Sequence, residues 1–226
     1  MKDRVLGLDG FKKRWLGVTL LDGRFHAARA FDSVLDALES EREASVVAID
    51  IPIGLGDRDG RPADHEAKQF VGPRSSSVFL AFPEAVFAAA SFAEAVLLAR
   101  QLTGKGLSQQ SYALRAKIKE AAIAAERDSR VFEVHPEVSF RSLAGAPLGF
   151  SKKSWNGLME RRRLLEAADI SIPADLPADA GSAGADDVLD AAIAAWTARR
   201  IAQGKGRTLP VMAAEPTGRL TGMIWY

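Results

Sequence analysis

Short apolar runs separated by turn signals fill the first fifty residues of the chain. Asp9-Gly10 and Asp22-Gly23 each follow such a run, and an Asp-Gly pair in this setting is typical of a tight turn. The run that ends in Asp50 is apolar at every position, which predicts a strand buried on both faces. The predicted elements are strands at 5–8, 14–21, 24–30 and 46–49, with a helix capped by Ser33 at 34–43.

The rest of the chain alternates between loop-like and helical stretches. Residues 52–82 are rich in Pro, Gly and Ser, which predicts a long loop with a short helix near 63–70, and loops of this length are usually functional or mobile. Beyond it we expect helices at 84–90, 91–102, 109–126, 154–168 and 186–203, a strand at 131–135 ended by Pro136, and short strands after Gly206. Alternating strands and helices indicate an α/β fold.

Composition places the chain among ordinary globular proteins. It has 226 residues, 47% hydrophobic and 26% charged, which excludes disordered, collagen-like and coiled-coil classes. We expect a single domain over 1–226, with a loop and helical insertion at 52–127. Thirty basic and 29 acidic residues give a net charge of +1, so any contact with nucleic acid requires a local patch.

The chain contains no cysteine, which excludes disulfides, Cys-ligated metals and thiol catalysis and is compatible with a reducing compartment. The charged start MKDRVLGLDG lacks the apolar core of a signal peptide. No stretch approaches 18 uncharged apolar residues. The expectation is therefore a cytoplasmic protein without a membrane partner.

Several familiar catalytic motifs are missing. The three histidines, His26, His65 and His135, are scattered, and no serine lies in a G-x-S-x-G motif. The Gly104–Gly106 segment lacks the spacing of a phosphate-binding P-loop, and no G-x-G-x-x-G follows a predicted strand.

Acidic residues at the ends of predicted core elements are the main candidates for chemistry. Asp9 and Asp50 end strands, and Glu133 lies near the end of another. Asp187 and Asp190 are three residues apart, which places both carboxylates on one face of the last helix. Converging carboxylates bind Mg²⁺ or Mn²⁺, and two such ions support hydrolysis of a phosphodiester.

Each acid also has a structural interpretation. Asp9 is compatible with an ordinary turn. Asp186 and Asp187 lie in the first helical turn, where acids favour the positive end of the helix dipole. Asp190 lies beyond a capping position, and Asp50 ends an apolar run in which a lone carboxylate is costly to bury.

Six blocks of sequence occur in the order seen in a bacterial family. They are Asp9-Gly10 with Trp15, DIPIGL at 50–55, GPRSSSVF at 72–79, LSQQSYAL at 107–114, EVHPEVSF at 133–140 and DDVLDAAIAAWTA at 186–198. The chain thus resembles domain of unknown function 429 (DUF429), a family predicted to be nucleases with a ribonuclease H-like fold. The resemblance spans about residues 4–203.

The resemblance implies a mixed five-stranded sheet flanked by helices. Its first three strands are antiparallel, and its fourth and fifth strands are parallel to the first. The acid positions of this fold group match Asp9, Asp50 and Asp187 or Asp190. In the nuclease hypothesis, Asp9, Asp50 and Asp187 hold metal, Asp190 is a further catalytic acid, and Glu133 or Glu137 is an additional ligand or base. The 52–82 loop has no counterpart in simple nucleases of this group.

Candidate substrate-binding residues lie outside the acid set. Arg74, with Ser75 and Ser76, is suited to an anion, although a polar turn fits equally. Lys117 lies on the 109–126 helix and faces away from its basic neighbours.

Residues 151–163 carry a net charge of +4 and include Lys153 and Trp155. Trp155 is suited to stacking on a base. The alternative is a solvated helix face with Trp155 packed inward. The helices at 84–126 fit either a lid or a homodimer surface.

Three hypotheses follow for the function. The first is a nuclease dependent on Mg²⁺ or Mn²⁺, with nucleic acid as its partner. The second is a phosphotransferase of the actin and sugar-kinase-like group, which usually needs two lobes. The third is a non-catalytic binding protein that retains the fold. The near-neutral net charge counts mildly against a processive nuclease, which usually needs a broad basic face.

Overall fold

The computed structural model of the protein describes residues 3–211 and 222–226. Its strands are β1 (Arg4–Phe11), β2 (Arg14–Leu21), β3 (Arg24–Phe31), β4 (Val46–Ile49), β5 (Val131–Glu133), β6 (Thr208–Leu209) and β7 (Ile224–Trp225). Its helices are α1 (Val34–Ser40), α2 (Pro62–Val71), the 3₁₀ helix η1 (Gly72–Ser77), α3 (Glu84–Ala88), α4 (Phe92–Thr103), α5 (Gln109–Ala113), α6 (Arg115–Arg127), α7 (Pro136–Ala144), α8 (Trp155–Ala167), α9 (Ala178–Gly181) and α10 (Ala185–Ala202).

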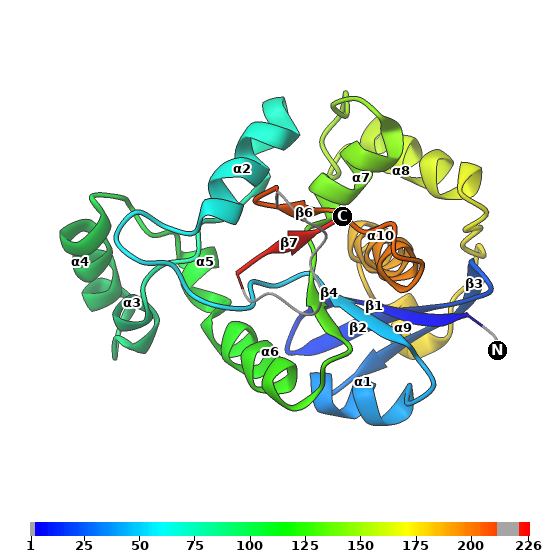
Figure 1. Ribbon diagram of the computed structural model, residues 1–226, viewed down its shortest axis with the longest axis horizontal. Helices are drawn as coiled ribbons and strands as arrows, with labels where there is room; N and C mark the ends of the chain where they lie inside the picture. Colours follow the sequence, from blue (N-terminus) through cyan, green and yellow to red (C-terminus); the bar gives the residue numbers. More distant parts are fainter. Residues whose placement is uncertain (1–2, 212–221) are drawn as a thin grey trace.

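Five strands form one mixed sheet in the order β3-β2-β1-β4-β5 (Figure 1). The first three strands pair antiparallel through two hairpins, and β4 and β5 run parallel to β1. The expected α/β fold, with three antiparallel strands followed by two parallel ones, is therefore confirmed. The carboxyl ends of β1, β4 and β5 meet at the same edge, where ligands bind in open α/β sheets.

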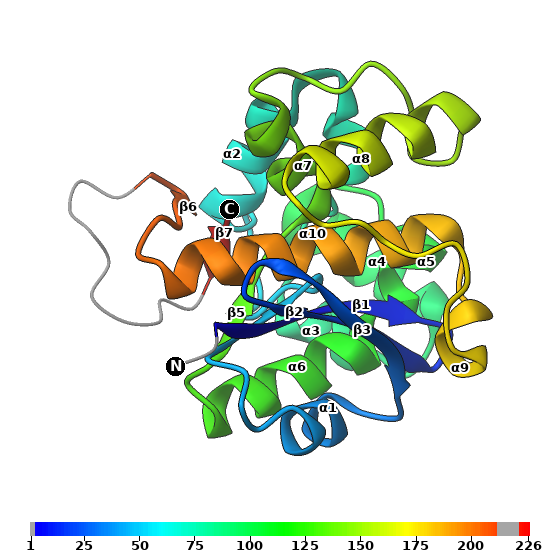
Figure 2. The same ribbon diagram turned by 90° about the vertical axis from the view of Figure 1, so that its right-hand side faces the viewer.

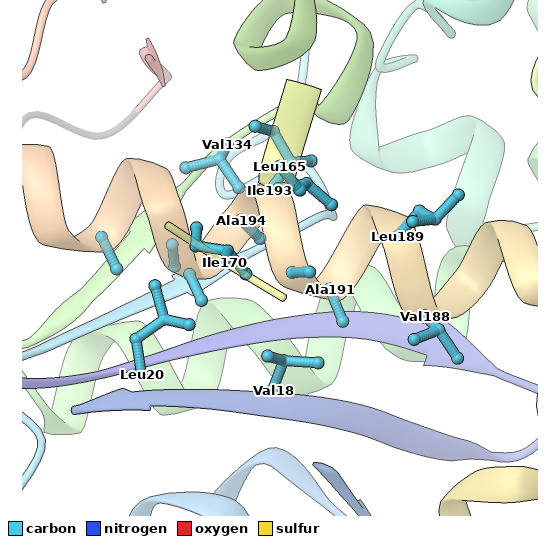
Figure 3. Packing of buried hydrophobic residues seen from close by; sticks show 14 of the residues in the cluster. Val18, Leu20, Val134, Leu165, Ile170, Val188, Leu189, Ala191, Ile193 and Ala194 are labelled. Atoms are coloured by element: carbon cyan, nitrogen blue, oxygen red, sulfur yellow. The ribbon is translucent and has the colours of Figure 1, made fainter. Parts of the chain in front are cut away.

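Helices cover both faces of the sheet (Figure 2). Helix α10 lies along one face, and α1 and α6 lie against the other. Figure 3 shows Val18 and Leu20 of β2 beneath side chains of α10 that include Ala191 and Ala194. The alanine-rich sequence of α10 lets this helix lie close to the sheet.

Gly7 sets the distance between β1 and α10. A Cβ atom at this position would lie 2.1 Å from the backbone nitrogen of Ala195 and 2.2 Å from the carbonyl oxygen of Ala191. Only glycine permits this approach, since both neighbouring atoms belong to the helix backbone. The contact holds the first half of α10, which carries Asp190, against the strand that carries Asp9.

The first turn differs from its prediction. Asp9 does not end a strand, because β1 continues to Phe11 and Asp9 pairs with Leu16. The chain reverses at Lys12, whose φ is 51°. Gly10 is compatible with strand geometry, so the Asp-Gly pair is not a turn here. The second Asp-Gly turn is confirmed, with positive φ at both Asp22 and Gly23.

Two helical predictions also need correction. The helix expected at 109–126 is divided at Leu114 into α5 and α6. The sequence patterns do not predict α7, because Pro136 there indicates only the end of a strand. Proline also favours the first position of a helix, and Gly145, with φ 70°, ends this one.

The region expected to form an insertion has two packing environments. Helices α3, α4 and α5 share a small core of their own, which includes Phe82, Val86 and Tyr112. Figure 1 shows them to one side of the sheet. Helix α6 instead packs into the main core through Ile118 and Ala121. The short strands expected near the end of the chain are β6 and β7.

Within residues 3–211 and 222–226, no helix combines the length and the apolar character that crossing a membrane requires.

Candidate active site

A cavity of about 380 Å³ lies where β1, β4 and β5 end. Asp9 and Asp50 line it from the sheet, and Asp186 and Asp187 line it from the start of α10. The other ionisable residues that line it are Arg61, Asp64, Lys117, Glu133, His135, Glu137, Lys152 and Lys153. The fold therefore brings together acids that are far apart in the sequence.

Asp9, Asp50 and Asp190 form the acidic centre of this site. Asp9 lies in β1, where its carboxylate accepts the N–H of Gly10 at 2.7 Å. Asp50 follows β4, and its N–H donates to the carbonyl of Leu8 at 2.9 Å, which fixes it beside β1. Asp190 reaches the centre from α10 and is only 1% exposed.

Burial raises the pKa values of all three carboxyl groups, and neighbouring acids raise them further. Burial raises the pKa of Asp9 well above its ordinary value, and the charges of Asp50 and Asp190 raise it further. Burial, followed by the charge of Asp190, raises the pKa of Asp50 to about 7. The pKa of Asp190 rises to about 6, mainly through burial and against the opposing effect of Lys152. The centre thus holds more negative charge than its surroundings neutralise.

Lys152 supplies part of the missing positive charge. Its ammonium donates to Oδ2 of Asp190, and the structure describes no hydrogen-bond partner for the buried Oδ1 of that aspartate. Burial lowers the pKa of Lys152, but the charges of Asp190 and Asp50 outweigh this effect and raise it overall. Lys152 is therefore protonated at neutral pH.

Asp187 takes a more peripheral position than Asp190. It is half-buried at the start of α10, and its Oδ2 accepts the N–H of Gly184 at 3.2 Å as part of the helix cap. Burial and the charge of Asp186 raise its pKa. Asp186 pairs with Lys153 at the surface. Of the pair predicted on this helix, Asp190 faces the acidic centre and Asp187 lies at its rim.

Glu133, predicted as a further metal ligand or base, is held by an arginine and by the backbone of Ile53. The guanidinium of Arg61 donates to both carboxylate oxygens of Glu133 at 2.6 and 2.8 Å, and the N–H of Ile53 donates to Oε2 at 2.6 Å. Burial raises the pKa of Glu133, against the opposing charge of Arg61. This paired carboxylate has few lone pairs left for a further ligand.

The same arginine fixes the far end of the 52–82 loop. Arg61 pairs with buried Asp64 at 2.5 Å, and Oδ2 of Asp64 accepts the N–H of Ala81 at 2.7 Å. The loop is thus attached to the sheet edge near Ile53 and again near Ala81. The network therefore buries two carboxylates, those of Asp64 and Glu133, with the single guanidinium of Arg61.

A second buried ion pair positions the segment that carries Lys152. Arg161 of α8 is fully buried, donates to Glu137 of α7 at 2.5 Å, and also donates to the carbonyl of Phe150 at 3.2 Å. The basic run at 151–163 is therefore not a uniform phosphate-binding surface. Its Arg161 links α7 and α8, while Lys152 and Lys153 face the cavity.

The predicted substrate-binding residues divide into two groups. Lys117 and Lys153 line the cavity, and the ammonium of Lys117 lies 3.9 Å from the ring centroid of Trp15. Arg74, Ser75 and Ser76 lie in or beside η1, outside the lining residues that the structure describes. Trp155 is also outside the lining. It is 72% exposed, so the inward packing considered for it does not occur.

His135 lines the cavity in a neutral form. Burial lowers its pKa to about 4, and its Nε2 lies 3.3 Å from the carbonyl oxygen of Ser77. No partner is described for its Nδ1. The sequence predicts no role for His135 or Arg61, although His135 lies in the motif block at 133–140, and it singles out Lys152 only as part of the basic stretch at 151–163.

The donor chemistry of the acidic centre fits a hard divalent cation. Oxygen ligands are the ones that Mg²⁺ and Mn²⁺ prefer, and the free Oδ1 of Asp190 is a buried acceptor that points to a missing donor. Among the described residues, no three carboxylate or imidazole groups lie at the spacing of a preformed ion site. In this arrangement the ammonium of Lys152 contacts Asp190.

The fold and the site define an α/β protein with an acidic cavity at the ends of its parallel strands. The chain belongs to the DUF429 family, whose description is "Protein of unknown function", and it matches that family over residues 7–215. No curated protein and no solved structure matches the chain.

Proposed function

We propose that this protein is a metal-dependent phosphodiesterase that acts on nucleic acid or its nucleotide fragments. The observation that carries the proposal is the convergence of Asp9, Asp50 and Asp190 from three separate elements onto one buried centre. Asp9 and Asp190 are buried and Asp50 is partly buried, and holding three acids together in this way is costly in a metal-free protein. Such an arrangement is typical of a functional site.

Asp9, Asp50 and Asp190 would hold Mg²⁺ or Mn²⁺, with Asp187 at the rim as a further ligand. A bound cation of this kind lowers the pKa of a water molecule and neutralises charge on a phosphoryl oxygen. The remaining tasks fall to the chain itself. Lys152 and Lys117 offer ammonium groups to the phosphate, and the Arg61–Glu133 pair holds the loop that closes one side of the cavity.

The order of the strands also supports this function. The β3-β2-β1-β4-β5 sheet is the arrangement that a ribonuclease H-like fold implies, and Asp9, Asp50 and Asp190 stand where that fold group carries its acids. The phosphotransferase alternative needs two lobes of this kind. The described residues hold one five-stranded sheet and a separate two-stranded one.

The test is hydrolysis of bis(p-nitrophenyl) phosphate and of single-stranded, duplex, hybrid and junction oligonucleotides with Mg²⁺ or Mn²⁺. Asp50→Asn and Asp190→Asn should each lower the rate more than about a hundredfold, beyond the loss expected for a group that only supports a ligand. Asp175→Asn, at an exposed acid, is the matched control and should keep the rate.

Hydrolysis that persists in both variants, or that is unaffected by EDTA, contradicts the proposal. Circular dichroism of each variant separates loss of activity from loss of the fold.

A further inference from the structure

One wall of the cavity is apolar and aromatic. Its residues are Val78, Phe79 and Leu80 from the segment after η1, Phe87 of α3, and Leu114 between α5 and α6. Phe79 is 37% exposed, although it stands in a cavity rich in charged groups. An apolar ring kept open to solvent beside such groups is typical of a surface that contacts a ligand.

Polar groups line the same cavity as this wall. Gln110 of α5 is exposed and lines the cavity, and its side-chain amide has both a donor and an acceptor to offer. Lys117 and Lys152 line it together with Asp9 and Asp50. The cavity therefore combines aromatic rings, an amide, ammonium groups and carboxylates.

The size of the cavity limits what it can hold. Its volume of about 380 Å³ lies near the lower end of the range for small-molecule sites, roughly 300–1,000 Å³. This volume suits one ring system joined to a sugar and a phosphate. A base pair with both of its backbones needs an open groove, whereas enzymes that act on one nucleotide of a strand bind it in a separate pocket.

We propose that the cavity binds a single nucleoside monophosphate unit, with its base against Phe79 and Phe87, its base edge at Gln110 and its phosphate at the lysines and aspartates. This proposal deepens the proposed function and rests on it for the chemistry at the phosphate. The base-binding wall is a separate claim. The unit is either a free nucleotide or the unpaired end of a strand.

In the first experiment, the full-length protein is titrated with thymidine without added metal, and NMR monitors the binding. Thymidine has no phosphate, so its binding tests the wall independently of any cation. We expect binding to the unaltered protein, with nuclear Overhauser effects from the base protons to the rings of Phe79 and Phe87. Absence of these effects at saturating thymidine overturns the proposal.

Two variants sharpen this test. Phe79→Ala should weaken thymidine binding about fivefold or more, the lower limit for loss of one base-stacking contact. Leu97→Ala removes a more exposed apolar side chain, 67% exposed on α4 and outside the cavity, and should leave binding unchanged. Equal binding by both variants overturns the proposal. If Phe79→Ala does not fold, the nuclear Overhauser effects in the unaltered protein still test whether the base lies against Phe79 and Phe87.

Comparing ligands of different length shows whether the bound nucleotide is a free molecule or the unpaired end of a strand. Tighter binding of thymidine 5′-monophosphate than of a single-stranded hexanucleotide indicates a free nucleotide, and the reverse indicates a strand end. A blunt duplex that binds as tightly as the single strand contradicts a one-nucleotide pocket. Thymidine binding without any hydrolysis would overturn the proposed function alone, and hydrolysis without thymidine binding would overturn the pocket alone.

Discussion

The three central aspartates differ in how each carboxyl group is surrounded. Asp190 has a contact with Lys152, and Asp9 has the N–H of Gly10. The charges of Asp190 and Glu133 raise the pKa of Asp50, and Lys152 and a hydrogen bond with Asp9 lower it. These partners offset only part of the effect of burial on Asp50, whose pKa rises to about 7. Its ionisation should cost the metal-free protein stability.

The pH dependence of stability tests this account of Asp50. Its pKa is about 7 in the folded protein against 3.8 ordinarily, so the folded state binds this proton more tightly. The stability that it contributes is present below about pH 4 and is lost as the pH rises through 7. Asp50→Asn has no such loss.

We therefore expect the variant to gain stability over the unaltered protein between pH 5 and 8, by up to about 1.4 kcal/mol per pH unit. Urea unfolding in EDTA at several pH values measures this difference. Asp175→Asn should show a constant difference over the same range. A constant difference for Asp50→Asn would mean that its carboxyl group ionises normally.

At the scale of the elements, the site depends on two supports. Gly7 lets α10 approach β1, and the Arg61 network attaches both ends of the 52–82 loop to the sheet edge. The first support sets where Asp190 lies, and the second shapes one wall of the cavity.

Gly7→Ala should destabilise the protein by more than about 3 kcal/mol. Overpacking usually costs about 1–3 kcal/mol, and here the clashing atoms are backbone atoms that cannot rotate away. Gly106→Ala is the control, because nothing lies within 4 Å of its added Cβ. Denaturant unfolding of the two variants measures the effect, and similar midpoints would show that β1 and α10 can separate at little cost.

Arg61→Met should both destabilise the protein and loosen the loop. It leaves Glu133 and Asp64 buried without their cation, and breaking a buried ion pair costs about 3–5 kcal/mol. Limited proteolysis should then cut within 52–82 faster than in the unaltered protein. Arg58→Met changes an exposed arginine of the same loop and should alter neither property. Equal cleavage of the two variants would mean that the loop is held by other contacts.

At the scale of the whole molecule, local patterns predicted the elements better than their arrangement. The apolar runs and turn residues located most strands and helices, because such signals depend on neighbours in sequence. The parallel placement of β4 and β5 came from the resemblance to DUF429. The start of α7 was missed because Pro136 serves both to end a strand and to begin a helix.

The candidate site was predictable only where a side chain follows a strong local signal. Asp50 ends a buried strand, and Asp190 lies on a long helix beyond its cap, so both were found. Lys152 reaches the centre through a segment that Arg161 and Glu137 hold in place, and Arg61 meets Glu133 across 72 residues of sequence. Contacts of this range depend on the folded arrangement and leave no local pattern.

The central claim is that Asp9, Asp50 and Asp190 together bind a divalent cation. The most direct measurement is anomalous scattering at the manganese edge from crystals grown or soaked with Mn²⁺. The account predicts a peak among these three carboxylates, with Lys152 no longer in contact with Asp190. A map with no peak there at millimolar Mn²⁺, and with Lys152 still paired to Asp190, would contradict it.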